Sequence, residues 1–266
     1  KYRLLISTLT LLPMANICLL NVSCNKQDQD IDKQYKQQII DELIGNQELN
    51  IKGLTSVPRP STYHDKIVPY LKQRIKDIAG LSDDKIHVDD APNIYFDIPA
   101  SSGCENKDMV ILQGHTDMVV VGMTEAEQIK TPIDAVIDGS LIHSRDYKTS
   151  IGGDDGIGVA AILALIQNKT VKHGKLRVIF SNCEENAMQG AMMMVDGHRN
   201  DQGEVIQGQE ATNPHIMQGV KYVLNLDASI SKQLIVSCSG GVGSHYSKTY
   251  NPTIDPKYTN CFVLTA

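Results

Sequence analysis

Short apolar segments that alternate with longer, helix-patterned segments restrict the fold of this chain more than any other feature. The expected strands span residues 93–98, 109–112, 141–143, 176–180 and 222–226. The expected helices span residues 35–44, 63–78 and 187–195, with one more that starts at residue 155. This alternation predicts an α/β fold whose sheet has substantial parallel character. In such sheets, ligands bind at the carboxyl ends of the strands.

Composition limits the class of partner. The chain has 266 residues, of which 41% are hydrophobic, and a formal net charge of -6. This is enough for one catalytic domain with a hydrophobic core and part of a second domain. The negative charge and the lack of a basic run exclude a nucleic-acid partner, because a phosphate-binding surface needs clustered lysines or arginines. The six cysteines form no CxxC pair, so the sequence indicates neither a cysteine zinc site nor a disulfide framework.

The first residues predict the location of the protein. Lys1 and Arg3 precede an apolar stretch over residues 4–20, which is typical of a signal peptide. A transmembrane anchor and a buried helix are the alternatives, although the stretch is short for spanning hydrocarbon. Residues 22–26 resemble a bacterial lipoprotein cleavage site in which Cys24 is lipidated, and the polar residues 25–38 would then form a tether. We therefore expect an exported protein that touches a membrane only through a lipid anchor, with a cytoplasmic protein as the alternative.

The expected strand 109–112 continues into a histidine and an acid two residues apart. His115 and Asp117 lie on the same side of an extended segment. A metal ligand and the acid that orients it have this arrangement. The alternative is a loop histidine with a helix-capping aspartate, since the HxD pattern is common.

Two further pairs of adjacent acids follow in the chain. Asp154 and Asp155 lie in a glycine-rich turn that opens a helix, and Glu184 and Glu185 follow the expected strand 176–180. Both pairs could simply cap helices. Capping does not explain the glycines around the aspartates, which allow the backbone to approach another group closely. Because adjacent side chains of an extended segment point in opposite directions, the two glutamates can have different roles.

A single acid, Asp227, follows the expected strand 222–226 and means little alone. Together, however, four turns would bring an acid to one edge of a sheet, and one of them also brings His115. Crowded acids need compensation, and a divalent cation supplies it. Oxygen ligands with an imidazole suit zinc, cobalt or manganese. The competing interpretation is a set of helix caps and solubilising loop acids.

In the order of these residues the chain resembles the M20 family of metallopeptidases, and most closely its aminoacyl-histidine (Xaa-His) dipeptidase branch. The similar segments are residues 57–61, 105–107, 112–119, 137–139, 153–158, 184–185, 224–227 and 240–241. The resemblance implies two metal ions, zinc in the first place and cobalt or manganese otherwise. It implies that His115 and Asp227 bind one ion, that Glu185 binds the other, and that Asp154 bridges both.

The resemblance also implies the chemistry. Glu184 would be the general base, and Asp117 would orient His115. A metal-activated water would then hydrolyse dipeptides or other short peptides. The alternatives are a carboxypeptidase, tripeptidase or N-acyl amino acid deacylase of the same family. From a different class, a metal-stabilised, peptide-binding lipoprotein without catalysis remains open.

The domain organisation follows from the same resemblance. We expect a signal peptide over residues 1–24, the tether over 25–38 and a three-layer zinc-peptidase catalytic domain over 39–237, with a mixed, largely parallel sheet. Residues 238–266 would begin a smaller α/β lid domain, which forms homodimers in many members of the family. The family's remaining ligand for the Glu185 ion is a histidine late in a longer chain. We therefore expect this sequence to be an N-terminal portion that is inactive alone.

Departures from the family pattern concern the last of the metal ligands. The family usually has polar neighbours around the acid at position 227, whereas Leu226 and Ala228 flank it here. We therefore expect fewer hydrogen bonds to orient Asp227, but we still expect Asp227 to bind the metal.

Overall fold

The computed structural model describes residues 4–5, 26–198, 200 and 204–227. All of them belong to one compact unit, residues 1–233, and a second unit, residues 234–266, lies outside the described residues. Cys24 and most of the expected signal peptide also lie outside them, as does the expected lid segment 238–266. Among the helices that the structure describes, none combines the length and the apolar character that crossing a membrane requires.

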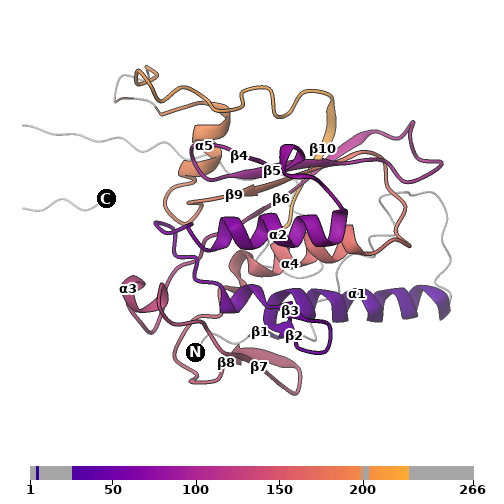
Figure 1. Cartoon of the computed structure of the whole chain (residues 1–266), viewed down its shortest axis with the longest axis vertical. Helices are drawn as coiled ribbons and strands as arrows, with labels where there is room; N and C mark the ends of the chain where they lie inside the picture. Colours follow the sequence, from indigo (N-terminus) through magenta and orange to yellow (C-terminus); the bar gives the residue numbers. More distant parts are fainter. Residues whose placement is uncertain (1–3, 6–25, 199, 201–203, 228–266) are drawn as a thin grey trace, which may run out of the picture. The chain divides into compact units, whose positions relative to one another are not determined.

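A five-stranded mixed sheet forms the centre of the molecule (Figure 1). Its strand order is β10 (Val220–Asn225), β6 (Met109–His115), β9 (Leu176–Ser181), β5 (Ile94–Ile98) and β4 (His87–Val88). Strands β10, β6 and β9 are parallel neighbours, whereas β5 and β4 join antiparallel. The predicted α/β class with a mixed sheet is therefore confirmed, and its parallel character lies in the three strands that precede the candidate site residues.

The register of these three strands decides where their ends lie. His115, the last residue of β6, pairs with Ser181, the last residue of β9. On the other side of β6, Asn225 of β10 pairs with Gln113. Strands β6 and β9 therefore end level and β10 ends two residues short of them, so the segments that follow the three strands leave from the same edge of the sheet.

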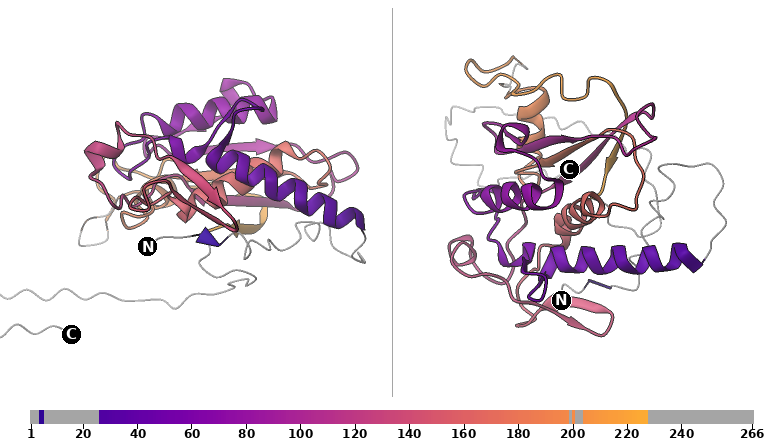
Figure 2. Two further views of the ribbon diagram at one scale, coloured as in Figure 1. Left: turned by 90° about the horizontal axis from the view of Figure 1, so that it is seen from below. Right: turned by 45° about the vertical axis from the view of Figure 1, so that its right-hand side comes forward.

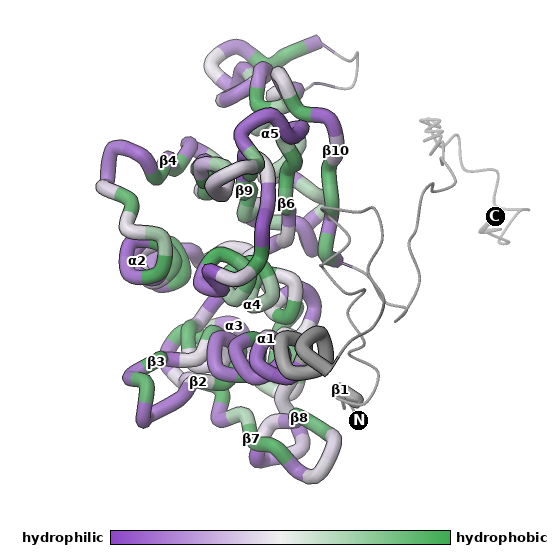
Figure 3. Tube along the Cα trace, turned by 90° about the vertical axis from the view of Figure 1, so that its right-hand side faces the viewer, coloured by the Kyte–Doolittle hydropathy of each residue, from purple (hydrophilic) through white to green (hydrophobic). Residues whose placement is uncertain are grey.

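Three helices lie on one side of the sheet, in two layers: α1 (Lys26–Ile44), α2 (Ile67–Ala79) and α4 (Gly153–Gln167). Helix α4 lies between the sheet and α1 (Figure 3). All its residues from Val159 to Ile166 are buried, as expected for a helix that is apolar around its whole circumference. Tyr35 of α1 donates a hydrogen bond of 2.6 Å to the carbonyl oxygen of Ala161. This contact connects the two helix layers.

The opposite face of the sheet carries a smaller apolar cluster. Ile111 and Ile179 of the sheet pack there with Met194 and Ile216. Met194 belongs to α5 (Gln189–Val195), which starts two residues later than the predicted helix 187–195. Ala187 and Met188 have left-handed backbone conformations, so the regular helix cannot include them.

Helix α1 corrects one expectation from the sequence. It begins at Lys26, so most of the segment expected to be a tether is helical. The lysines and glutamines that made residues 25–38 look like a tether are also good helix formers. The helix is stabilised because it buries Tyr35, Ile39 and Leu43 against the core. The low apolar content of residues 25–38 did not indicate this burial.

A hairpin lies on the far side of α1 from the central sheet (Figures 1 and 2). Strands β7 (Ala135–Asp138) and β8 (Leu141–Ser144) pair antiparallel, and β1 (Leu4–Leu5) pairs with β8. The predicted strand 141–143 therefore belongs to this separate three-stranded sheet. The remaining short elements are β2 (Gly45–Asn46), β3 (Ile51–Lys52), η3 (Leu54–Ser56), η4 (Asp83–Lys85) and α3 (Glu125–Gln128).

The packing of α4 predicts a large cost for truncating its side chains. Leu163 is fully buried, so we expect Leu163→Ala to lower the free energy of unfolding by about 2–5 kcal/mol. Chemical denaturation followed by circular dichroism measures this change. Leu49→Ala is the matched control, because Leu49 is 60% exposed and its truncation should leave the stability nearly unchanged. Equal stabilities of the two variants would contradict the central position of α4.

Candidate metal centre

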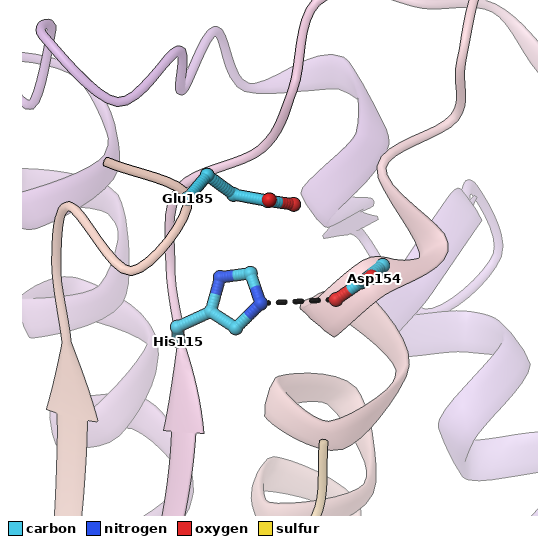
Figure 4. A group of neighbouring side chains, drawn as sticks. All are labelled: His115, Asp154 and Glu185. Atoms are coloured by element: carbon cyan, nitrogen blue, oxygen red, sulfur yellow. Dashed lines mark hydrogen bonds and ion pairs between the residues drawn. The ribbon is translucent and has the colours of Figure 1, made fainter. Parts of the chain in front are cut away.

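The shared carboxyl edge of β6, β9 and β10 brings the predicted site residues to one place. His115 ends β6, Glu184 and Glu185 follow β9, and Asp227 follows β10. Asp154 lies in the turn that opens α4, where it and Asp155 still have non-helical backbone angles and are joined by a cis peptide bond. Figure 4 shows the side chains of His115, Asp154 and Glu185 converging from three elements.

Two groups of potential metal ligands share His115. In the first, His115 Nε2 lies 3.0 Å from Asp154 Oδ1, and Glu185 completes the group. In the second, the same nitrogen lies 4.0 Å from Glu184 Oε2 and 3.9 Å from Asp227 Oδ2. The ligand atoms of each group lie within 4.8 Å of one another, which one cation could span. Both glutamates belong to such a group, so their division into ligand and base stays a prediction.

Asp117 connects the histidine to the turn that carries the glutamates. Its backbone carbonyl oxygen lies 3.1 Å from His115 Nδ1, and Oδ1 of its buried carboxylate lies 3.3 Å from the same nitrogen. The same carboxylate accepts hydrogen bonds from the backbone N–H groups of Glu184 (3.0 Å) and Glu185 (3.3 Å). This is the geometry of an acid that orients a histidine ligand. The link to the glutamate turn is an additional role that the HxD spacing alone did not indicate.

Asp155 contributes more to the site than the sequence suggested. Its carboxylate caps α4 by accepting a hydrogen bond from Gly158 N–H (3.0 Å), as the capping interpretation expected. Its other oxygen accepts one from the backbone N–H of His115 (3.1 Å). A Cβ atom at Gly114 would lie 2.6 Å from that oxygen, so β6 and α4 approach closely only because residue 114 is glycine. Asp155 thus fixes the backbone of the histidine, whereas its neighbour Asp154 points toward the imidazole.

Arg59 is a second residue whose position the sequence did not reveal. From the sequence, residues 57–61 were notable only as one of the segments that resemble the M20 family. In the structure the Arg59 side chain is fully buried beside the turns that carry Asp117 and Asp154. The glycines on both sides of Asp154 and Asp155 were the available signal, because they indicated that some group approaches this turn closely.

The pKa values show a surplus of negative charge in the site. Burial raises the pKa of Glu184, Glu185 and Asp227, and the charge of Asp154 raises each of them further. Burial also raises the pKa of Asp155 to about 7. Burial lowers the pKa of His115, but hydrogen bonding to Asp117 and the charge of Asp155 outweigh this effect and raise it to about 9. One imidazole among carboxylates that resist ionisation is a donor set that fits a divalent cation.

Comparison with known proteins identifies the family. The family model of peptidase family M28 matches residues 93–260, a range that contains every predicted metal ligand. The chain belongs to peptidase family M28. The cytosol non-specific dipeptidase of Escherichia coli (strain K12) is 30% identical over 194 residues, which are 71% of this chain and 34% of that protein. This M28-family chain thus spans about a third of the length of that relative.

Solved structures confirm the fold. The aminoacylhistidine dipeptidase from Vibrio alginolyticus superposes with a TM-score of 0.51 and 26% identity, covering 73% of this chain and 33% of that one. A tripeptidase from Staphylococcus aureus superposes with a TM-score of 0.51 and 18% identity, covering 73% of this chain and 43% of that one. The M28 chain therefore has the α/β architecture of peptidase catalytic domains. Its placement in the M20 family and in the Xaa-His branch stays a prediction.

The raised pKa values predict how the stability of the metal-free protein depends on pH. A folded-state pKa above the unfolded value means that stability is lost as pH rises between the two values. For Asp155 this interval runs from 3.8 to about 7, and for His115 from 6.5 to about 9. We therefore expect the melting temperature of chelator-treated protein to fall across both intervals.

The contribution of His115 can be separated by substitution. In His115→Asn the melting temperature should fall less steeply above pH 6.5 than in the wild type. His87→Asn, at an exposed position of β4, should leave the wild-type fall in melting temperature unchanged. Melting temperatures measured at closely spaced pH values test this expectation. A wild-type profile that stays flat over these intervals would contradict it.

Proposed function

We propose that the whole protein is a metal-dependent peptidase that hydrolyses dipeptides or other short peptides, with Xaa-His dipeptides as the first substrates to test. The observation that carries this proposal is the convergence of four carboxylates, in two groups that share His115, from three turns far apart in the sequence. The family match and the dipeptidase names of the Escherichia coli and Vibrio relatives support the reaction class and the substrate size.

The metal ligands in this proposal are His115, Asp154, Glu185 and Asp227, for two divalent ions with zinc as the first choice. Bound at this site, such ions lower the pKa of a water molecule and polarise a carbonyl group. The chain itself holds the ligands in place. Asp117 orients the His115 ring, and Asp155 fixes its backbone.

Glu184 is the proposed general base. Its pKa is raised, by burial first, and a carboxyl group whose pKa moves toward neutrality is better suited to accept and return a proton. Its side chain is 33% exposed, so a substrate can reach it. The hydrogen bond from its backbone N–H to Asp117 holds the residue beside the imidazole. In this role Glu184 takes a proton from the attacking water and gives it to the leaving amine.

Export and dimerisation are separate proposals. Lipidation of Cys24 rests on residues 1–26 alone, and a homodimer through a lid rests on the resemblance to the M20 family. Neither is needed for the chemistry of the metal centre.

The central experiment measures hydrolysis by the whole protein loaded with zinc or manganese. We expect turnover of Xaa-His dipeptides and a loss of about 10²–10⁴-fold in kcat for Glu184→Gln, because the base is removed while the ligands remain. Metal content, measured by mass spectrometry, should be unchanged in this variant. Glu48→Gln, at an exposed position on the same unit, is the control and should keep full activity.

Each result has a defined consequence. Turnover of tripeptides or N-acyl amino acids in place of dipeptides would replace the substrate assignment but keep the reaction class. Tight metal binding with no turnover of any of these substrates would favour the binding protein without catalysis. Full activity of Glu184→Gln would contradict the role of Glu184 as the base.

A further inference from the structure

Arg59 makes an unusual set of hydrogen bonds for a buried cation. Its Nη1 atom donates to the carbonyl oxygens of Thr116 (3.0 Å) and Asp117 (3.2 Å), and its Nη2 atom donates to the carbonyl oxygen of Gly152. The first two carbonyls follow β6 directly after His115. The third lies two residues before Asp154. One planar guanidinium group therefore connects the backbone of the two segments that carry these ligands.

The backbone of Arg59 is held as firmly as its side chain. Its N–H donates to Oε1 of the fully buried Gln128 (3.2 Å), and its carbonyl oxygen accepts from Met118 N–H (3.0 Å). The next residue, Pro60, forms a parallel bridge with Met118. These backbone contacts fix the point from which the Arg59 side chain extends. The guanidinium group in turn holds the three carbonyl groups that it binds.

Two glycines of the turn leave room for this group. A Cβ atom at Gly152 would overlap Arg59 Nη2, and one at Gly156 would lie 2.7 Å from the same atom. The glycines around Asp154 and Asp155 suggested a close approach of the backbone to another group. In the structure that group is the Arg59 side chain.

We propose that Arg59 is a positioning residue that sets the affinity of the metal centre, by holding the His115–Asp117 segment and the Asp154 turn at the separation a metal ion requires. The proposal rests on the metal-dependent function proposed above. It assigns no contact between Arg59 and metal or substrate. A purely structural role would lower stability and leave metal affinity unchanged.

The test measures zinc affinity of the whole protein by competition with a chromophoric chelator. We expect Arg59→Met, which keeps an unbranched apolar chain and removes charge and donors, to bind zinc about 10–100-fold more weakly. The absorption spectrum of the cobalt-loaded variant should also change, because the spectrum reports ligand geometry. Melting temperatures of the metal-free proteins are measured in parallel.

Arg74→Met is the matched control. Arg74 forms an ion pair with the fully buried Glu42, between α2 and α1. Arg74 Nη2 also lies 3.4 Å from Gln167 Oε1, at the end of α4 opposite to Asp154. This variant should lower the melting temperature, because it leaves Glu42 buried without its partner, and should bind zinc like the wild type.

Gly156→Ala keeps the charge of Arg59 and serves if Arg59→Met does not fold. Its added methyl group displaces the guanidinium, since the nearest other atoms, Leu43 Cδ1 and Leu54 Cδ2, are farther away at 3.4 Å. Zinc binding should weaken. In the double variant with Arg59→Met the methyl group has room, so zinc affinity should be no lower than in Arg59→Met alone.

The outcomes separate this inference from the proposed function. A wild-type protein that binds no zinc would overturn the proposed metal centre itself. If the wild type binds zinc and either Arg59→Met or Gly156→Ala binds it equally well, only the role of Arg59 is overturned. An additive loss in the double variant would also overturn it, because the two substitutions would then act independently.

Discussion

Repulsion among the carboxylates gathered at the carboxyl edge of the sheet is the constraint on which much of the surrounding structure depends. Several carboxylates approach one imidazole, and burial with mutual repulsion raises the pKa of Glu184, Glu185 and Asp227. Such a cluster persists in a folded protein only if the backbone holds the acids together and other groups offset their charge. Strands β6, β9 and β10, which end at the same edge of the sheet, supply the first condition. Arg59 offsets part of the negative charge, whereas Asp117 and Asp155 accept hydrogen bonds from the backbone of the glutamates and of His115.

Because strand register sets the positions of the ligands, the core and the site are coupled. Helix α4 packs its buried residues against the sheet, and its first turn carries Asp154 and Asp155. Asp155 accepts hydrogen bonds from the backbone of both β6 and α4. Glycine at position 114 allows this close approach. A shift of α4 against β6 would therefore move Asp154 relative to His115 and change the ligand geometry directly.

The sequence predicted those features that depend on local patterns. Strand-length apolar segments ending in acids gave the α/β class, and the order of His115, Asp154, Glu185 and Asp227 gave a set that the structure brings together. Helix α1 was predicted too short because residues 26–34 have a composition shared by tethers and exposed helices. Arg59 and the full role of Asp155 could not be predicted, since each depends on backbone groups of segments distant in the sequence. Only the glycines gave an indirect sign of these contacts.

The geometry of His115 also limits how two metal ions could share the site. The neutral imidazole offers one lone pair at Nε2, so the two ligand groups that meet at this atom cannot both use it at once. Asp154 has no such restriction, because a carboxylate has two oxygens and this side chain is 72% exposed. With Nδ1 directed at Asp117, the histidine could serve only a single ion, through Nε2. Glu184, Glu185 and Asp227 also have two carboxylate oxygens each, so this argument limits His115 to one ion, and the bridging role of Asp154 stays a prediction of the family resemblance.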